Sequence, residues 1–538
     1  MKKTIIKIFA FSLGAGLLVT GCTKNFDQIN TDPTQASAAN FDPNLLLPSA
    51  ELGYVDAVTG YNGPILFQSM WTQTFASAIF PGYYSGGDKY VQGGSFLSYQ
   101  GRTWDACYKS ASFVREIQNL TKGNTAMSNL SGIAAINEIL NIQAVTDVYG
   151  DCPYSQALQA KAGISQPVYD KQQDIYNLML ARLDSVIPTL DPAKAIPTND
   201  VLPYAGNIAQ WKKFGYSLML RMAMRLTKAD AVTAKKYAEK AYAGGVFSSN
   251  ADNAYIIFDN SHGFSNANSR SLTTAEDYSE VKWGKVLIDY LKATNDPRLT
   301  VISEVPQPGK ANAANESLAG DNTFAKQQGM PNGYDQNALA TDISHAPGYP
   351  GATGTGGDIN PTGGYSRPTT SVYLALNTPS FILTYAQTEL LLAEAAVRGW
   401  SVGASASVHY ANGLAAAIQT YGTLSATGAI SAGTANTYAA ANPLDVTTTD
   451  NSLKQINTQY WVLTGTIFDF DEAWTNWRRS GYPVLTPVNY TGNFTSGTIP
   501  RRQAYPTSEA STNPNNYKTA VAGLTGGDNY AGKVWWDK

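Results

Sequence analysis

Pairs of amphipathic helices are the pattern that most restricts what this chain can fold into. An amphipathic helix buries its apolar stripe against a neighbour, so helices in sequential pairs predict a mainly α fold of stacked, tetratricopeptide-like hairpins. Apolar residues recur at helical spacing in six segments that form three such pairs: 102–120 with 129–148, 170–187 with 208–228, and 380–398 with 405–421.

Local signals predict where several of these helices begin and end. Residues 170–173 and 207–210 each have the spacing of a capping box. Pro379 suits the first turn of a helix, because its missing N–H would be unpaired there. Gly150 is expected to end the helix over 129–148.

Long irregular stretches separate the helices. Residues 303–370 are rich in Gly, Pro, Asn and Ala, and residues 422–450 are nearly all Ala, Thr, Gly, Ser and Asn. This composition is typical of linkers or disorder, whereas loops of this length inside a compact domain usually carry function. The C-terminal segment combines turn residues with Trp, Tyr and Arg, which predicts irregular structure packed onto the helices.

The N-terminus has the form of a bacterial lipoprotein signal. Lys2, Lys3 and Lys7 precede an apolar run over 8–19, and the run ends in a lipobox, VTGC, at Cys22. The run is shorter than the roughly 20 residues that a membrane-spanning helix needs. We expect Cys22 to carry the lipid after cleavage, which anchors the chain to a membrane without spanning it. The alternative is a plain secretory signal with a chance cysteine.

The charge and aromatic content of the chain restrict the kinds of molecule that it can bind. Removal of residues 1–21 takes away three lysines and no acid, which lowers the formal net charge from −3 to −6. This balance, and the lack of Lys/Arg blocks, argue against a nucleic-acid partner. Charged residues make up only 15% of the chain, which also has 32 Tyr and 10 Trp. Low charge and many aromatics favour neutral sugars as ligands.

Two thiols, Cys107 and Cys152, remain besides Cys22. Export to an oxidising space permits a disulfide between them, and the alternative is two buried small hydrophobic residues. Cys107 falls on an apolar helical face, so it is expected to point into a core. The spacing fits no zinc motif.

The sequence contains no catalytic motif. None of its three histidines lies near a Gly-x-Ser-x-Gly elbow, and no P-loop or EF-hand pattern occurs. No cofactor is expected, and structural calcium has no supporting motif. A glycosidase needs only two carboxylates placed by the fold, for which the crowded Asp469, Asp471 and Glu472 are candidates. We favour the alternative, that they are helix N-terminal acids on a packed segment.

The stretch FPGYYSGGDKY, residues 80–90, holds four aromatics and three glycines. Tyr83 and Tyr84 lie among glycines and are hard to bury together. Tyrosine combines an apolar face with a polar edge, which suits the CH face and hydroxyls of a sugar. Exposed aromatic clusters in loops tend to mark recognition surfaces. The alternative is a loop pinned onto the protein body by its aromatics.

Eight motifs follow the lipobox in a fixed order: NTDP (30–33), AVTDVYGDCPYSQAL (144–158), PVYDKQQDIY (167–176), WKKFGYSLMLRMAMR (211–225), YAQTELLLAEAA (385–396), EAWTNWRRSGYPVL (472–485), IPRRQAYPTSE (499–509) and GGDNYAGKVWWDK (526–538). In this order they are quite specific, although each is weak alone. Through them the chain resembles the SusD/RagB family of surface lipoproteins, most closely its SusD-like branch.

The resemblance implies a fold in which four tetratricopeptide-like helix pairs support an irregular, loop-rich ligand-binding half. The expected organisation is a signal peptide over 1–21, a lipidated tether over 22–43 and a single SusD-like domain over 44–538. Family members lie on the outer face of the outer membrane and cap a SusC-like TonB-dependent barrel. They capture oligosaccharides or other nutrients for it and are not enzymes.

The main hypothesis is therefore a lipid-anchored glycan-binding protein that delivers its ligand to such a barrel. A binder of peptides or another nutrient for the same type of importer, and a surface glycoside hydrolase, are the alternatives.

Two departures and one shared feature limit what the resemblance transfers. Position 152 usually carries a small aliphatic residue in the family, so Cys152 leaves the disulfide question open. The binding loops of the family vary widely, so no ligand residue transfers by motif. The motifs at 477–479, 501–502 and 535–536 are expected to be structural, with guanidinium groups buried against aromatic rings.

The ligand site of the family draws on an early loop and on insertions between the middle helices. Rigid aromatic rings freeze few torsions when a glycan stacks on them, which favours them as contacts. The expected ligand-binding residues are Trp71, Gln73, Tyr83, Tyr84 and Asp88 in the early segment, Tyr278 and Trp283 in a second, and Tyr334 and Tyr349 in the Gly/Pro-rich stretch.

Overall fold

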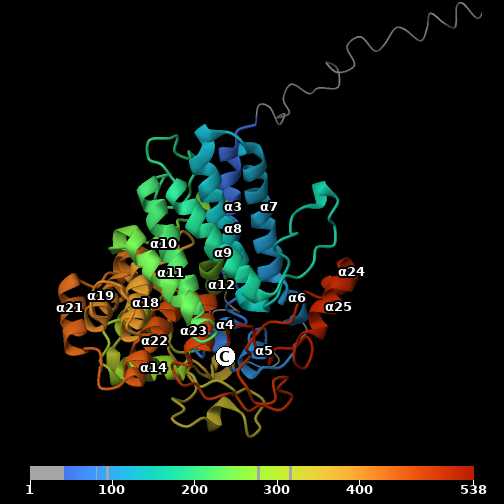
Figure 1. The fold of residues 1–538 in the computed structure, drawn as a ribbon. Helices are drawn as coiled ribbons and strands as arrows, with labels where there is room; N and C mark the ends of the chain where they lie inside the picture. Colours follow the sequence, from blue (N-terminus) through green and yellow to red (C-terminus); the bar gives the residue numbers. More distant parts are fainter. Residues whose placement is uncertain (1–40, 80–81, 93–95, 275–278, 314–317) are drawn as a thin grey trace, which may run out of the picture. The chain divides into compact units, whose positions relative to one another are not determined.

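Helices account for most of the regular structure (Figure 1). The computed structural model describes residues 41–79, 82–92, 96–274, 279–313 and 318–538. Residues Asn44–Lys538 form one compact unit. The longer helices are α3 (Leu47–Ala57), α7 (Arg102–Thr121), α8 (Ser128–Tyr149), α9 (Gln172–Val186), α10 (Ile208–Arg225), α11 (Ala231–Gly244), α18 (Tyr385–Val397), α19 (Ala406–Gln419), α21 (Ala432–Ala441), α22 (Thr449–Thr466) and α23 (Phe470–Ser480).

Consecutive helices pack against one another. α7 packs on α8 and α18 packs on α19, which confirms two of the three predicted pairs. In the third, α9 contacts both α8 and α10, but α10 packs mainly on α11, a helix that the sequence analysis missed. α22 with α23 is a further pair. Helices α3, α7, α8 and α9 lie side by side in Figure 1, and α10, α11, α18 and α19 continue the layer.

Helix boundaries agree with the predicted signals only in part. The Asn207 side chain accepts hydrogen bonds from the N–H groups of Ala209 and Gln210, and Gly150 ends α8 with φ 87°, as predicted. The predicted box at 170–173 is wrong. The carboxylate of Asp170 instead accepts from backbone N–H groups of the loop that follows α8, at 2.8 Å, because Asp can satisfy a nearby turn as readily as a helix end.

The predicted helix start at Pro379 is also wrong. The segment after it forms strand β6 (Ser380–Leu383), which pairs antiparallel with β2 (Ala254–Ile256). A short apolar run fits a buried strand as well as a helix, and here pairing with β2 decides. Helix α18 begins only after Thr384, whose side chain and that of Gln387 form a capping box.

Residues 422–450 are not a linker. Most of the stretch is helical: it takes in the end of α20 (Tyr421–Leu424), a 3-10 turn over Ala426–Gly428, all of α21 and the start of α22. Ser431 and Thr448 cap these helices by accepting from Thr434 and Asn451 N–H groups. Alanine has the highest helix propensity of all residues, so its abundance here supports helix once caps define the ends.

Short antiparallel strand pairs connect the loops of the described chain. They are β1 (Phe75–Ala76) with β3 (Lys282–Trp283), β2 with β6, and β4 (Ser303–Glu304) with β5 (Arg367–Pro368). Short helices lie before, between and after the strands: α4 (Gln68–Trp71), α5 (Ser85–Lys89), α6 (Phe96–Tyr99), α12 (Ala267–Thr273), α14 (Lys285–Ala293), α15 (Leu299–Ile302), α16 (Lys310–Ala313), α17 (Thr370–Tyr373), α20 (Tyr421–Leu424), α24 (Glu509–Thr512) and α25 (Pro514–Ala522).

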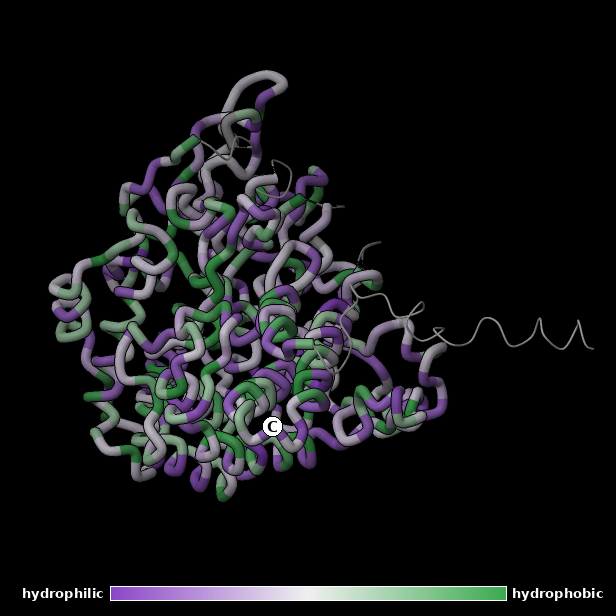
Figure 2. The backbone as a smooth tube through the Cα atoms, turned by 90° about the horizontal axis from the view of Figure 1, so that it is seen from above, coloured by the Kyte–Doolittle hydropathy of each residue, from purple (hydrophilic) through white to green (hydrophobic). Residues whose placement is uncertain are grey.

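Buried arginines and tryptophans fix the C-terminal segment onto the helices, as predicted. The guanidinium of Arg478 lies 3.5 Å from the ring centre of Trp474 and 4.7 Å from that of Trp536. Arg479 donates to both carboxylate oxygens of Glu394 at 2.7 Å. Hydrophobic segments run through the middle of the molecule in Figure 2.

Cys107 and Cys152 are both buried, and neither forms a disulfide. They serve as small apolar core residues, one of the two predicted roles. Burial raises the pKa of both thiols above the ordinary value, which keeps them protonated. No helix in the described ranges is long and apolar enough to span a bilayer.

Candidate ligand-binding site

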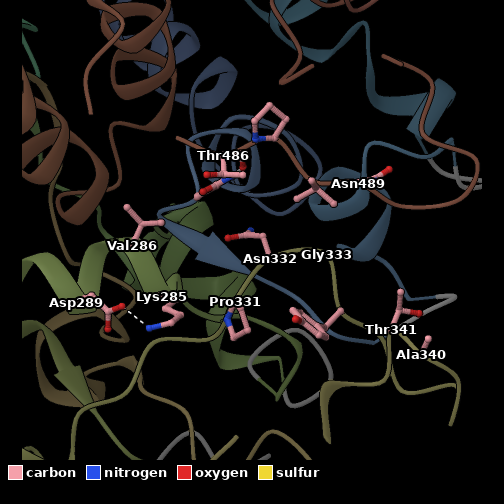
Figure 3. Close-up of a pocket in the computed structure, with 14 residues that line it drawn as sticks. Lys285, Val286, Asp289, Pro331, Asn332, Gly333, Ala340, Thr341, Thr486 and Asn489 are labelled. Carbon is pink, nitrogen blue, oxygen red and sulfur yellow. Dashed lines mark hydrogen bonds and ion pairs between the residues drawn. The ribbon is translucent and has the colours of Figure 1, made fainter. Parts of the chain in front are cut away.

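An open pocket of about 470 Å³ lies where three distant segments meet (Figure 3). One wall is the first turn of α14, a second is the loop over 331–341, and a third is the segment over 486–489. We refer to it as the Asn332 pocket. Its lining residues are Gln73, Lys285, Val286, Asp289, Pro331, Asn332, Gly333, Tyr334, Ala340, Thr341, Thr486, Pro487, Val488 and Asn489.

Backbone hydrogen bonds join the first two walls. In the β1–β3 pair, Phe75 lies opposite Trp283. The chain on either side of Trp283 is then tied to the loop, because Met330 N–H donates to Trp283 O and Lys285 N–H donates to Met330 O, both at 2.8 Å. The start of α14 and the loop after Met330 are thus held together by the main chain, independently of their side chains.

A buried ion pair lies behind the 331–334 loop. Asp88 and Lys89 are both fully buried, and their charged groups are 3.3 Å apart. Asp88 also accepts hydrogen bonds from Asn332 Nδ2 at 2.6 Å and from Gly333 N at 2.7 Å. Burial raises the pKa of Asp88, and Lys89 and these donors oppose the rise. Burial likewise lowers the pKa of Lys89. The ion pair therefore fixes the loop, although removing its two charges from water costs free energy.

Gly333 is required where the loop passes Val488. Its φ is 87°, in the left-handed region that favours glycine. A Cβ at this position would lie 2.8 Å from Val488 Cγ1. The close approach of these two segments, which forms the floor of the pocket, thus depends on the missing side chain.

A second buried carboxylate, Asp335, stabilises the far side of the loop. It accepts from Thr341 Oγ1 at 2.6 Å, from Asn337 Nδ2 at 2.8 Å and from Tyr490 Oη at 2.8 Å. Burial, together with the bond to Asp335, raises the pKa of Tyr490 to about 12. The bond to Tyr490 links the loop to the segment that forms the third wall.

The surface of the pocket is polar but nearly uncharged. Amide and hydroxyl groups come from Gln73, Asn332, Thr341, Thr486 and Asn489, and Tyr334 adds a partly buried ring. Its charged lining residues, Lys285 and Asp289, form an ion pair with each other, as Figure 3 shows. Such a surface can donate and accept hydrogen bonds with a neutral, hydroxyl-rich ligand.

Comparison with known proteins places the chain in a family. A family model described as SusD-like, starch-binding and associating with the outer membrane matches residues 51–506. The chain belongs to the SusD-like family. The mainly α SusD-like fold expected from the sequence is thereby confirmed.

Solved structures extend the likeness. A chitin-binding protein is 30% identical, with a TM-score of 0.75, and the match covers 92% of this chain and 100% of that one. A SusD-like protein of Bacteroidetes AC2a is 23% identical (TM-score 0.76, covering 93% and 100%), and a chitin-binding SusD homolog of Flavobacterium johnsoniae is 22% identical (TM-score 0.72, covering 92% and 98%). These last two show the fold alone. A search of curated protein sequences gave no match.

The structure of this SusD-like protein brings two of the predicted ligand residues to the pocket. Gln73 and Tyr334 line it, and the Gln73 side chain donates to Thr486 O at 2.6 Å. Asp88 was expected on the surface but lies beneath the pocket, where it holds Asn332 and Gly333.

Three predicted aromatics are core residues rather than surface platforms. Trp71, Tyr84 and Trp283 are each 0% exposed. The Trp71 ring lies 5.0 Å from that of Trp474, and the Trp283 ring lies 4.8 Å from that of Phe75. Burying an aromatic side chain removes about 150–250 Å² from water and contributes about 4–6 kcal/mol, which explains why the core takes these rings.

The remaining predicted residues lie elsewhere. Tyr83 is partly exposed beside Tyr61, with ring centres 5.2 Å apart. Tyr349 packs on a small separate core around Met330 and donates to a backbone carbonyl. Tyr278 and the lipidation site Cys22 fall outside the described residues.

Most of the polar lining residues were not predicted from the sequence. Asn332 and Thr341 lie in a stretch whose composition had marked it as a loop, so that signal was available. Thr486 and Asn489 come from the turn-rich segment after the motif that ends at Leu485. Single polar residues in loops follow no period, and only the fold shows that they converge.

The crowded acids Asp469, Asp471 and Glu472 lie inside the protein, each at most 9% exposed. Glu472 pairs with Arg225 at 2.5 Å. Burial raises the pKa of Asp469 to about 7 and that of Asp471 to about 8. The adjoining cavity measures about 20 Å³, enough for one water molecule and far too small for a sugar. No three metal-ligating side chains gather anywhere in the described part of the chain.

Proposed function

We propose that this chain is a lipid-anchored protein of the outer-membrane surface that binds neutral oligosaccharides in the Asn332 pocket and passes them to a SusC-like TonB-dependent barrel. The observation that carries the proposal is the chemistry of the pocket surface. Neutral amides and hydroxyls surround the ring of Tyr334, and the two charged lining residues, Lys285 and Asp289, neutralise each other in an ion pair. Sugar hydroxyls exchange hydrogen bonds with such groups without bringing a charge out of water.

Oligosaccharides of β-linked N-acetylglucosamine are the ligand that we favour. The relative with 30% identity is a chitin-binding protein. An acetamido group is neutral and has one donor and one acceptor, which match the amides of Gln73, Asn332 and Asn489. Peptides or another nutrient for the same type of importer are the alternative.

We propose further that the protein is not a catalyst. Hydrolysis of a glycosidic bond ordinarily uses two carboxyl groups about 5–10 Å apart on either side of the bond. The lining of the pocket supplies one carboxylate, Asp289, and this is neutralised by Lys285. The glycoside hydrolase alternative is tested by incubating the protein with polysaccharides. If new reducing ends form with the wild-type protein but not with Glu472→Gln, the protein is a glycoside hydrolase.

Calorimetry tests the binding proposal. The soluble chain from Thr23 onward retains the whole compact unit Asn44–Lys538. We expect it to bind chitohexaose more tightly than maltohexaose, cellohexaose or a neutral hexapeptide. Tyr334→Ala should weaken binding by about thirtyfold, or roughly 2 kcal/mol.

Tyr242→Ala is the matched control, since Tyr242 is an exposed tyrosine on α11. Unchanged affinity in Tyr334→Ala would place the site elsewhere, and preference for the peptide would favour the alternative ligand.

Anchoring is tested separately from binding. Cys22→Ala removes the proposed thioether, so the protein should leave the membrane fraction while ligand affinity stays the same. Retention on membranes that lack the barrel would contradict lipid anchoring. Copurification of the wild-type protein with a TonB-dependent barrel would support delivery, and its absence in gently solubilised membranes would count against it.

A further inference from the structure

A second large pocket, of about 430 Å³, lies between α6, α25 and the C-terminal segment. Among the described residues it shares no lining residue with the Asn332 pocket. Helices α6 and α25 lie at the same edge of the molecule in Figure 1. Aromatic rings from four parts of the chain line it, and we refer to it as the tyrosine pocket. The rings are those of Phe494, Tyr505, Tyr517 and Tyr530.

The buried polar groups of the tyrosine pocket are bonded within the protein. Gln100 donates to Tyr505 O and accepts from the Tyr530 hydroxyl, both at 2.7 Å. Asp528, the charged residue of the described lining, forms an ion pair with Arg502 at 2.7 Å. A ligand in this pocket therefore meets the faces and edges of aromatic rings in a setting without net charge.

The exposed lining residues of the tyrosine pocket supply hydrogen-bonding groups and an apolar surface. Gln92 and Thr507 are exposed and carry an amide and a hydroxyl, and Leu97 is 45% exposed. The rings of Phe494 and Tyr530 lie 4.7 Å apart. A pyranose has apolar CH faces and hydroxyls around its edge, so it matches a pocket of rings bordered by neutral polar groups.

The segment that forms the third wall of the Asn332 pocket continues into the tyrosine pocket. Asn489 lines the first pocket and Phe494 lines the second. Five residues of chain span at most about 18 Å, which limits the separation of the two linings. Thr491 and Gly492, between them, are exposed, so the surface along the segment is open to solvent. Phe494 N–H donates to Tyr90 O at 2.8 Å, which fixes the far end of the segment.

We propose that the tyrosine pocket is a second subsite for the same glycan, so that the protein selects long oligosaccharides. The ligand extends from the Asn332 pocket across Thr491 and Gly492 into the tyrosine pocket. This inference rests on the proposed function. The two pockets differ in chemistry: the Asn332 pocket hydrogen-bonds the polar groups of the sugar, and the tyrosine pocket stacks on its CH faces. Once the first pocket is occupied, contact with the second is intramolecular, which raises the affinity for a chain that reaches both.

Calorimetry with chitobiose and chitohexaose, on the soluble chain from Thr23 onward, tests the proposal. We expect chitohexaose to bind at least about tenfold more tightly than chitobiose. Leu97→Ser combined with Tyr517→Ala should weaken chitohexaose binding by about tenfold and leave chitobiose binding nearly unchanged. Tyr517→Phe removes the hydroxyl that donates to Asp528 but keeps the ring, so it should retain the affinity of the wild-type protein.

Two variants guard against effects on folding. Leu97→Ser alone changes an exposed residue, so it keeps the test available if the double variant does not fold, and it should weaken chitohexaose binding by about threefold. Leu178→Ser is the matched control, because Leu178 on α9 is 49% exposed and is not among the described lining residues of either pocket. It should bind both oligosaccharides like the wild-type protein.

The outcomes separate this inference from the proposed function. If Tyr334→Ala weakens binding of both oligosaccharides but the tyrosine-pocket variants weaken neither, the second subsite alone is wrong. Equal losses for chitobiose and chitohexaose in the tyrosine-pocket variants would also overturn it, because the pocket would then not extend the first. If neither oligosaccharide binds, or Tyr334→Ala binds both normally, the proposed function fails and the second subsite fails with it.

Discussion

The buried Asp88–Lys89 pair gives the sharpest test of how the Asn332 pocket is held. The two residues are adjacent in sequence and both side chains are inaccessible to solvent. Lys89 also donates to Ser77 O at 2.8 Å, and Asp88 accepts from Asn332 and Gly333. Each charge therefore depends on the other, and the pocket loop depends on Asp88.

The contacts set the expected magnitudes. Asp88→Asn leaves the Lys89 ammonium buried without its counter-charge, which should cost about 3–5 kcal/mol of unfolding free energy. Lys89→Met leaves the carboxylate of Asp88 with neutral donors only and should cost a similar amount. The double variant removes both charges, so it should lose about 2–3 kcal/mol less than the sum of the single variants.

Urea unfolding at pH 7, monitored by circular dichroism, gives these free energies. Asp289→Asn is the matched control, because its partner Lys285 lies at the same pocket but both side chains are about half exposed. That variant should lose less than about 1 kcal/mol. Additive losses in the Asp88 and Lys89 variants would refute the reasoning, since they would show that the two charges do not stabilise each other.

Two further predictions concern buried ionisable groups and are measured by the same unfolding assay across pH. Burial and Arg367 lower the pKa of Lys282 to about 7, so the unfolded chain binds the extra proton and stability rises with pH between about 7 and 10. Lys282→Met should raise the free energy of unfolding by up to about 4 kcal/mol at pH 7 and abolish its rise with pH. A rise with pH that persists in the variant would contradict this prediction. Burial and Asp469 raise the pKa of Asp471 to about 8, so the folded protein holds the proton and stability falls as pH rises from about 4 through 8. Asp471→Asn should leave the free energy of unfolding nearly unchanged at pH 4 and raise it by up to about 5 kcal/mol at pH 8; an equal effect at both pH values would contradict this prediction.

The part of the fold that could be predicted is the part in which apolar residues recur at helical spacing. Helices α7 and α10 have apolar stripes at helical spacing whose burial stabilises them, whereas α8 is buried on nearly every side. The helix predicted at 380 failed over Ser380–Leu383, where four residues are too few to show a period and pairing with β2 decides. Asp170 does not cap a helix, because backbone N–H groups in the loop after α8 donate to its carboxylate instead.

The site was less predictable because aromatic residues have the same chemistry in a core and on a binding surface. Trp71 and Trp283 were reasonable candidates by residue type, yet each fills a core position among other rings. Tyr334 was found because it lies in a long Gly/Pro-rich loop, where a ring has fewer core neighbours. Asn332 and Asn489 give no signal in isolation, since an amide in a loop is ordinary until the fold places it beside others.

The stretch FPGYYSGGDKY shows how a glycine-rich aromatic segment can serve a site without lining it. A Cβ on Gly87 would lie 1.8 Å from Leu66 O, so this glycine permits close packing rather than a flexible loop. Tyr84 and Tyr90 are fully buried on either side of it. The turn is thereby fixed in the interior, and Asp88 reaches Asn332 and Gly333 from beneath. The aromatic residues of this segment therefore hold the carboxylate of Asp88, which positions the pocket loop. The groups that face the ligand can be neutral amides, because the charges that order the loop, Asp88 and Lys89, are buried beneath it.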